Sequence, residues 1–394
     1  MPWKAMSAME QRREFVRLVR QGGVPIAELC RRFGISRQSG HELLRRVASE
    51  GEAGFEARSR RPHSSPRQTP AAIEAQILAL RERHPAWGGR KLARRLSDLG
   101  VTGVPSPSTV TEILHRHSRL EAAGVERPRR WQRFERAAPN ALWQMDFKGH
   151  FALDRGRCHA LTVIDDHARY ALGLRACGDE TEQTVRGQLT ALFRRFGLPE
   201  MMLADNGSPW GCAWSEYTAL GVWLLRLGIE LRHGRVRHPQ TQGKDERFHR
   251  TLDVELLQMQ RFADLVACQA SFDAWRVIYN EERPHEALGL ATPASRYQAS
   301  PRSFPEQLPE PQYHASDEKR RVRWDGSLKF RGRRFKLSQA FAGLDVALRP
   351  ANTDGLWRVF FSRFAIAQID LSDGEASAQP VKDLSEQVST MSPV

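Results

Sequence analysis

The sequence contains no run of about 18 apolar residues, the length that a helix needs to span a membrane. Its first residues, Met1-Pro2-Trp3-Lys4, also lack the apolar segment of a secretory signal. Only five cysteines occur, and no two of them form a CxxC pair. A disulfide framework and a structural zinc site are therefore both disfavoured. Together these absences predict a cytoplasmic protein that does not enter a membrane.

Acidic residues are scarce in the first third of the chain. Residues 1–138 contain 27 Lys and Arg but only 14 Asp and Glu, so this part carries +13 of the net charge of +14. Arginine far outnumbers lysine there, and its planar guanidinium group suits phosphate and guanine recognition. Solubility alone does not require such an uneven distribution. The charge therefore predicts that the first third binds nucleic acid.

At 394 residues the chain is expected to fold as several domains, the first of them at residues 1–60. Ser7 and Glu10 form a capping-box pattern, and Ser36 is placed to cap a third helix after the break at Gly34. This is the pattern of a helix-turn-helix domain, although a plain three-helix bundle would share it. The first residues of the last helix of such a domain meet base edges. DNA contacts are therefore predicted for Arg37, Gln38 and Ser39.

A second helix-turn-helix domain, winged-helix-like in form, is predicted at residues 66–122. Thr69 is expected to cap its first helix, with Pro70 in the first helical position. Ser108 is expected to cap its last helix, and Ser108 and Thr109 are predicted to contact DNA. Two such modules on one chain indicate a long, asymmetric binding site.

Residues 138–300 alternate between strand and helix patterns, which predicts an α/β layer domain. Beyond it, residues 313–371 have short alternating runs with the turn signals Asp325-Gly326 and Asp354-Gly355, which predict a small SH3-like β-barrel. Three segments lack periodicity: residues 51–68 and 300–312 are predicted to be linkers, and residues 372–394 a disordered tail.

Three carboxylates of the α/β domain carry the candidate chemistry. Asp146 and Asp205 each end an apolar run, and Glu246 lies on the first turn of a predicted helix. Each alone has an ordinary structural explanation, in turn chemistry or in the helix dipole. In combination they provide the hard oxygen ligands that a pair of Mg²⁺ ions requires. Asp146 is predicted to bridge the two ions, with Asp205 on one ion and Glu246 on the other.

Three segments around these carboxylates resemble the retroviral-integrase-type core of DDE transposases, and bacterial insertion-sequence transposases in particular. They are Trp143-Gln144-Met145-Asp146, Leu203-Ala204-Asp205-Asn206-Gly207 and His238-Pro239-Gln240-Thr241-Gln242-Gly243-Lys244-Asp245-Glu246-Arg247-Phe248. The two helix-turn-helix units match the usual N-terminal layout of that family. Forty residues lie between Asp205 and Glu246, more than is usual for the family. The excess falls in the Trp-rich stretch 208–228, which is interpreted as an insertion in a loop.

The resemblance implies an RNase H-like core and a DNA transposase that binds the terminal repeats of an insertion sequence. It implies Mg²⁺-dependent strand cleavage by water, followed by strand transfer from the freed 3′-hydroxyl, with Mn²⁺ able to substitute. Asp146, Asp205 and Glu246 would be the catalytic metal ligands, and Lys244 and Arg250 would hold phosphates of the DNA end. His238 and His249 are interpreted as DNA contacts. A homo-oligomer on DNA is expected, because two ends must be held together, within a nucleoid-associated bacterial protein.

Two other functions remain open at this point. One is a DNA-binding regulator, or a transposase remnant, whose core has lost catalysis. Three buried carboxylates without metal would repel one another, which argues against it. The other is a plain RNase H-like nuclease, although tandem helix-turn-helix modules serve a sequence-reading function that a general hydrolase does not need.

Overall fold

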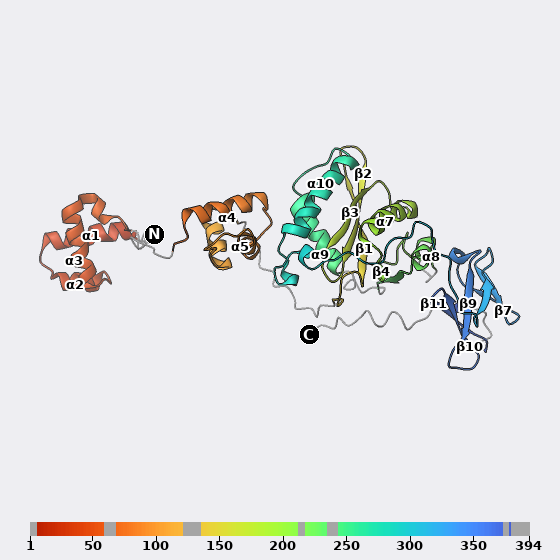
Figure 1. Cartoon of the computed structure of the whole chain (residues 1–394). Helices are drawn as coiled ribbons and strands as arrows, with labels where there is room; N and C mark the ends of the chain where they lie inside the picture. The colour runs from red at the N-terminus through yellow and green to blue at the C-terminus, as the bar shows by residue number, and fades with distance from the viewer. Residues whose placement is uncertain are drawn as a thin grey trace. The chain divides into compact units, whose positions relative to one another are not determined.

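The computed structural model describes residues 6–58, 68–120, 135–211, 217–234, 243–372 and 378–379 (Figure 1). They belong to two units, residues 1–68 and residues 69–394. In the described part of the chain, every helix is too short or too polar to traverse a lipid bilayer.

The first unit consists of helices whose ends follow local sequence signals. Its elements are α1 (Ala8–Gln21), α2 (Ile26–Arg32), α3 (Arg37–Glu50) and the short 3₁₀ helix η1 (Gly51–Phe55). The capping box of Ser7 and Glu10 is confirmed, and Ser36 accepts a hydrogen bond from the Ser39 N–H as predicted. The prediction that residue 51 begins a linker was wrong. Phe55 is buried in the core of this unit, where it packs with the apolar side chains of all three helices.

The second unit begins with a three-helix module, α4 (Ala71–Arg83), α5 (Gly89–Asp98) and α6 (Pro107–Arg116). Two predicted caps were misplaced. Pro70 is itself the N-cap residue of α4, so Thr69 does not cap it. The cap of α6 is Ser106, whose hydroxyl accepts from the Thr109 N–H, and Pro107 takes the first helical position. Ser108 therefore lies within the first turn of α6.

The central α/β domain is built on a five-stranded sheet in the order β3-β2-β1-β4-β5. Its strands are β1 (Trp143–Ala152), β2 (Arg157–Asp165), β3 (Ala171–Cys177), β4 (Met201–Ala204) and β5 (Glu230–His233). β1, β2 and β3 pair antiparallel, whereas β4 and β5 run parallel to β1. The resemblance implied an RNase H-like core, and this mixed sheet with β1 at its centre has that architecture.

Helices cover both faces of the sheet (Figure 1). They are α7 (Glu182–Phe196), α8 (Ala219–Arg226), α9 (Gly243–Leu252) with its π-helical continuation η3 (Asp253–Leu257), α10 (Leu265–Val277) with the π-helical η4 (Ile278–Glu282), and the 3₁₀ helices η5 (Glu286–Leu288) and η6 (Pro293–Ser295). α7 and α8 pack against Met145, Leu161 and Val163, while α9 and α10 pack against Ala160 and Ile164 on the opposite face. Because side chains alternate along a strand, Asp146 and Thr162 point to the α9 face.

Two segments pack on the core of this domain, although no such packing was predicted: the stretch 208–228, predicted to be a loop that leads into a helix, and the predicted linker 300–312. In the stretch 208–228, α8 is a buried helix, and Trp210 and Trp223 join the core beside α7. Phe304, in the predicted linker 300–312, also packs on that core, and the Arg302 guanidinium donates to the carbonyls of Pro199, Leu227 and Gly228. The predictions missed both because the partners of these side chains are distant in sequence.

The C-terminal region is rich in strands. They are β6 (Glu318–Arg321), β7 (Ser327–Phe330), β8 (Arg333–Lys336), β9 (Asp345–Pro350), β10 (Leu356–Phe361), β11 (Phe364–Asp370) and β12 (Ala378–Gln379), with the 3₁₀ helix η7 (Gln339–Phe341) between β8 and β9. β12, β11, β10, β9 and β6 form one sheet, and β7 and β8 form a separate hairpin. Hydrogen bonds among these described strands do not close the predicted barrel. Most of the predicted tail lies outside the described residues.

Candidate active site

Asp146 lies on the central strand of the sheet, at the point where the pairing with β4 ends. β1 pairs with β4 only through Trp143 and Gln144, whereas its pairing with β2 continues and places Asp146 opposite Thr162. Beyond Gln144 the β4 side of the strand is open. Asp146 is therefore held by a stiff strand, just beyond the last residue of β1 that pairs with β4.

Asp205 directly follows β4 and is level with Asp146. In the parallel ladder Gln144 pairs with Leu203, so the positions two residues further along each strand are Asp146 and Asp205. One oxygen of the Asp205 carboxylate accepts from the Gly207 N–H at 3.1 Å. The His233 ring donates from Nδ1 to the Asp205 carbonyl at 2.6 Å, which ties this turn to β5. The local turn thus orients Asp205 beside the central strand.

Glu246 lies on the first turn of α9 with its side chain exposed. Two contacts hold this helix against the sheet near Asp146. Lys148 of β1 pairs with Asp253 at 2.7 Å, and the His249 ring lies 2.9 Å from the hydroxyl of Thr162 on β2. The third predicted carboxylate therefore comes from a separate element that packs on the face to which Asp146 points.

The electrostatics of Asp146 connect all three predicted residues. The pKa of Asp146 is raised to about 7, mainly by burial, with the nearby carboxylates of Asp205, Glu180 and Glu246 acting in the same direction. Ionisation of Asp146 is thus opposed by its surroundings, and a bound cation would reverse this effect. Among the described residues, no three acidic, His or Cys side chains approach closely enough to hold one ion between them.

Glu180 is a fourth carboxylate near Asp146, and sequence reasoning did not identify it. It follows β3, and its Oε1 lies 2.8 Å from Nδ1 of His159 on β2. Its position after a strand repeats the signal that was used for Asp205. The pair Asp179-Glu180 at the end of an apolar run could therefore have been recognised as a candidate for the site. That step requires knowing that β3 and β1 belong to the same half of the sheet, on either side of β2.

Asp245, next to Glu246, is fully buried. Neither of its carboxylate oxygens has a hydrogen-bond partner among the described residues. Burial raises its pKa well above the usual value, and Asp146 and Asp166 contribute in the same direction. The start of α9 therefore brings a buried carboxyl group close to Asp146, in surroundings that disfavour its charged form.

The two cations predicted to hold a DNA end have different surroundings. The Lys244 ammonium pairs with Asp166, which is fully buried and also accepts from Gln144 and from the Arg136 N–H. Arg250, by contrast, is exposed on α9. Asp165 and Asp166 accept backbone and side-chain hydrogen bonds within the domain, which gives this pair of carboxylates a structural role. His238 lies outside the described residues.

The residues predicted to read DNA sequence lie on the first turns of two helices. Arg37, Gln38 and Ser39 begin α3, and Ser108 and Thr109 lie at the start of α6; all five are exposed. The N-terminal turn of a recognition helix is the part that faces base edges in this type of domain. The first module thus presents an arginine and two polar side chains at the start of α3, and the second presents two hydroxyl groups at the start of α6, where side chains can contact base edges.

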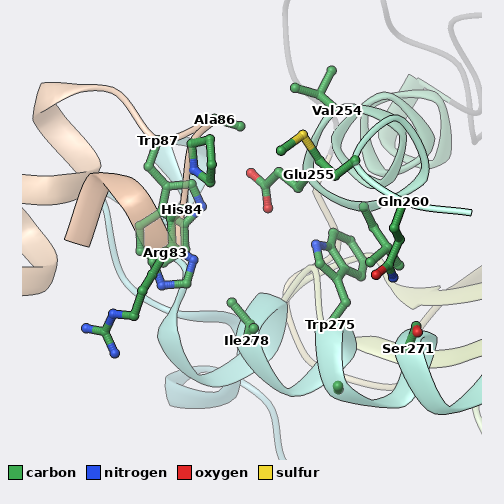
Figure 2. Close-up of a pocket in the computed structure, with 14 residues that line it drawn as sticks. Arg83, His84, Ala86, Trp87, Val254, Glu255, Gln260, Ser271, Trp275 and Ile278 are labelled. Atoms are coloured by element: carbon green, nitrogen blue, oxygen red, sulfur yellow. The ribbon is translucent and has the colours of Figure 1, made fainter. Parts of the chain in front are cut away.

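Within the second unit, the helical module contacts the α/β domain around a cavity of about 290 Å³. Figure 2 shows His84 and Trp87 on one side of it and Glu255 and Trp275 on the other. The His84 and Trp87 rings stack at 3.8 Å. Next to the cavity, Arg95 of α5 pairs with Glu282 at 2.8 Å. The module is therefore held against η4, the continuation of α10, and faces η3, the continuation of α9, across the cavity.

Comparison with known sequence families assigns each part of the chain. Residues 136–239 and residues 227–293 each match an Integrase core domain family, and residues 317–377 match the C-terminal domain of IS481 family transposases. Residues 11–63 match a Helix-turn-helix domain, and residues 39–114 a Homeodomain-like domain.

Individual proteins of insertion elements are also similar. The "Insertion element IS407 uncharacterized 31.7 kDa protein" of Burkholderia multivorans is 30% identical over 159 residues, which cover 40% of this chain and 55% of that protein. The "Insertion element IS476 uncharacterized 39.2 kDa protein" of Xanthomonas euvesicatoria is 27% identical over 69% of this chain and 78% of its own length. The "Transposase InsD for insertion element IS2A/D/F/H/I/K" of Escherichia coli is 28% identical over 70% of this chain and 91% of its own length. By these matches and its fold, the chain belongs to the insertion-sequence transposases that carry an integrase core, with the C-terminal domain of the IS481 family.

Proposed function

We propose that the chain cleaves DNA at the ends of an insertion sequence and joins the freed ends to target DNA. The observation that carries this proposal is the electrostatic grouping around Asp146. A strand, a turn and a helix supply Asp146, Asp205 and Glu246, and the latter two both raise the pKa of Asp146. Such a grouping is unfavourable without a cation and favourable with one.

The residues fit a divalent metal by their chemistry. Carboxylate oxygens are the ligands that Mg²⁺ and Mn²⁺ prefer, and the carboxylates of Asp205 and Glu246 both act on Asp146 to raise its pKa. Asp146, Asp205 and Glu246 would hold the two Mg²⁺ ions. When bound, the ions supply the positive charge that stabilises the attacking and leaving oxygens of a phosphoryl displacement.

The DNA contacts follow from the exposed polar residues. Arg37, Gln38 and Ser39 on α3, with Ser108 and Thr109 on α6, would read the terminal repeat. Arg250 is exposed on α9, so it can reach a phosphate of the DNA end without rearrangement. Lys244 could do so only by leaving Asp166. Between the two, the surroundings favour Arg250 as the phosphate contact.

Assembly and location are parts of the same proposal. Two ends must be joined in one reaction, so we expect a homo-oligomer assembled on DNA, in the bacterial cytoplasm at the nucleoid. The C-terminal β7–β8 hairpin and the five-stranded sheet share one apolar core that includes Leu328, Phe335 and Val359. This shared core supports a small SH3-like barrel for that region.

Strand transfer with the element's own end sequences tests the proposal. Asp146→Asn, Asp205→Asn and Glu246→Gln should each abolish joining in Mg²⁺ or Mn²⁺ while end binding survives. Glu281→Gln, at an exposed carboxylate of the same domain, should leave joining unchanged. Joining retained by one of the three variants would remove that residue from the metal site. End binding without any joining by the unmodified protein would instead support the inactive-regulator alternative.

A further inference from the structure

A chain of hydrogen bonds connects α9 to β1 through a residue of β2. Nε2 of His249 lies 2.9 Å from Oγ1 of Thr162, and the same hydroxyl donates to the backbone carbonyl of Asp146 at 3.0 Å. Thr162 is fully buried between the two elements. The chain thus begins one turn after Glu246 and ends on Asp146 itself.

The direction of each hydrogen bond follows from the groups involved. A carbonyl oxygen only accepts, so the single proton of the Thr162 hydroxyl belongs to the bond with Asp146. The hydroxyl must then accept from His249, whose Nε2 carries the proton. Burial lowers the pKa of His249 to about 4, with Lys148 of β1 acting in the same direction and Asp253 of η3 opposing it. At neutral pH the ring is therefore uncharged, with its proton on Nε2.

A second contact joins the same two elements. Lys148 lies two residues after Asp146 on β1, and its ammonium pairs with Asp253 at 2.7 Å. Residues three, four and seven positions apart share one face of a helix, so Glu246, His249 and Asp253 lie on the same side of α9. The face that presents Glu246 is thus the face that is fastened to the strand of Asp146.

We propose that His249 is a positioning residue: through Thr162 it fixes α9 against β1 and so sets the position of Glu246 relative to Asp146. This inference rests on the proposed function, which gives these two carboxylates their role. It also replaces the interpretation of His249 as a DNA contact, because its ring nitrogen is directed to a buried hydroxyl. Residues that orient metal ligands typically change activity or metal affinity by about 10- to 100-fold when substituted.

Four substitutions in the full-length protein separate this role from others. His249→Phe removes the donor and keeps a ring, whereas His249→Gln keeps an N–H near the position of Nε2. Thr162→Val removes the hydroxyl with little change of shape, whereas Thr162→Ser keeps it. Thr251→Val is the matched control, because within the described part of the chain the Thr251 hydroxyl donates to the Arg247 carbonyl of its own helix.

We expect His249→Phe and Thr162→Val to lower the rate of strand transfer at saturating DNA by about 10- to 100-fold and to raise the Mg²⁺ concentration for half-maximal rate. The affinity for end DNA should not change. His249→Gln, Thr162→Ser and Thr251→Val should stay within about threefold of the unmodified protein. The double variant His249→Phe/Thr162→Val should be no worse than either single variant, because both remove the same connection.

Amide hydrogen exchange in the metal-free protein gives a readout that does not depend on activity. Exchange at residues 248–252 should accelerate in His249→Phe and Thr162→Val but not in their conservative partners. Unchanged exchange together with a normal rate in both would overturn the proposal. A loss of end affinity with a normal saturating rate would return His249 to a DNA contact. If His249→Phe does not fold, the comparison of Thr162→Val with Thr162→Ser tests the proposal in its place. Joining retained by Glu246→Gln would refute the proposed function, while the exchange result would still test the connection.

Discussion

At the scale of single residues, Asp146 combines a functional role with an unfavourable environment. Burial and neighbouring carboxylates raise its pKa to about 7. Between its ordinary value and about 7, the folded state therefore binds more protons than the unfolded chain, and the stability of the metal-free protein falls as pH rises. The residue is thus stabilising only when it is protonated or when a cation is bound.

Asp146→Asn should consequently stabilise the metal-free protein at pH 8 while abolishing strand transfer. We expect its thermal midpoint to rise by about 2–4 °C, the shift that ~1 kcal/mol gives in a domain of this size. Near pH 5 the difference in thermal midpoint between the variant and the unmodified protein should shrink, because Asp146 is then protonated in the folded protein. Mg²⁺ should raise the midpoint of the unmodified protein at pH 8 but not that of the variant. A difference in thermal midpoint between the variant and the unmodified protein that is the same at both pH values would contradict this account of Asp146.

Lys244 and Arg250 provide a second test at this scale. Lys244→Met leaves the buried Asp166 without its cation, so it should lower the free energy of unfolding by about 1.5–3 kcal/mol. Arg250→Met, at an exposed position, should change stability by less than about 0.5 kcal/mol but weaken binding of end DNA. Denaturant unfolding and a binding titration on both variants measure this. A stable Lys244→Met protein with weak end binding would restore Lys244 as a phosphate contact.

How far these residues could be predicted depends on where their partners lie in the sequence. Asp146, Asp205 and Glu246 were found because each has a local signal, a strand or a helix start beside it. Glu180 was not identified from the sequence, and neither was the contact between His249 and Thr162. Their surroundings come from β1 and β2, and one sequence does not show which strands become neighbours. Local chemistry is visible in the sequence, whereas pairing across the sheet is not.

At the scale of elements, helix ends were predicted well where the signal is a cap and less well where packing decides. Ser7 and Ser36 cap as predicted, but Ser106 takes the place of Ser108 because Pro107 fits only the first helical position. Phe55 and Phe304 lie in stretches that have no periodicity, yet both pack on a core. Their burial depends on tertiary contacts that overrule local composition.

Gly89, the first residue of α5, shows how closely two elements pack. A Cβ atom there would lie 2.4 Å from Oγ1 of Thr111 and 2.5 Å from the carbonyl of Pro107, so Gly89→Ala forces α5 away from α6. We expect a loss of about 1–3 kcal/mol in the stability of the module. Gly88→Ala is the matched control, since no atom lies within 4 Å of its added Cβ. Protection of the α4–α6 amides from hydrogen exchange measures the stability of both variants. Equal protection in Gly89→Ala and Gly88→Ala would mean that the module accommodates the added Cβ atom without loss of stability.

At the scale of the whole molecule, recognition and chemistry are distributed over two units. Residues 1–68 form one unit and carry Arg37, whereas the carboxylates belong to residues 69–394. The excess positive charge falls almost entirely in residues 1–138, and the part with the carboxylates is nearly neutral. The chain therefore concentrates its attraction for DNA in its reading modules.

This division predicts different kinetic effects for variants of the two units. Arg37→Ala should weaken binding of the terminal repeat by about 1–3 kcal/mol, and random-sequence DNA much less, because a base contact specifies sequence. Its strand-transfer rate at saturating end DNA should be normal. Asp205→Asn should bind ends normally and join none. Binding titrations on both DNAs, with single-turnover joining, measure these effects. An equal loss on both DNAs would reduce Arg37 to a phosphate contact. A lower saturating rate would instead mean that end recognition by the first unit also helps to assemble the active site.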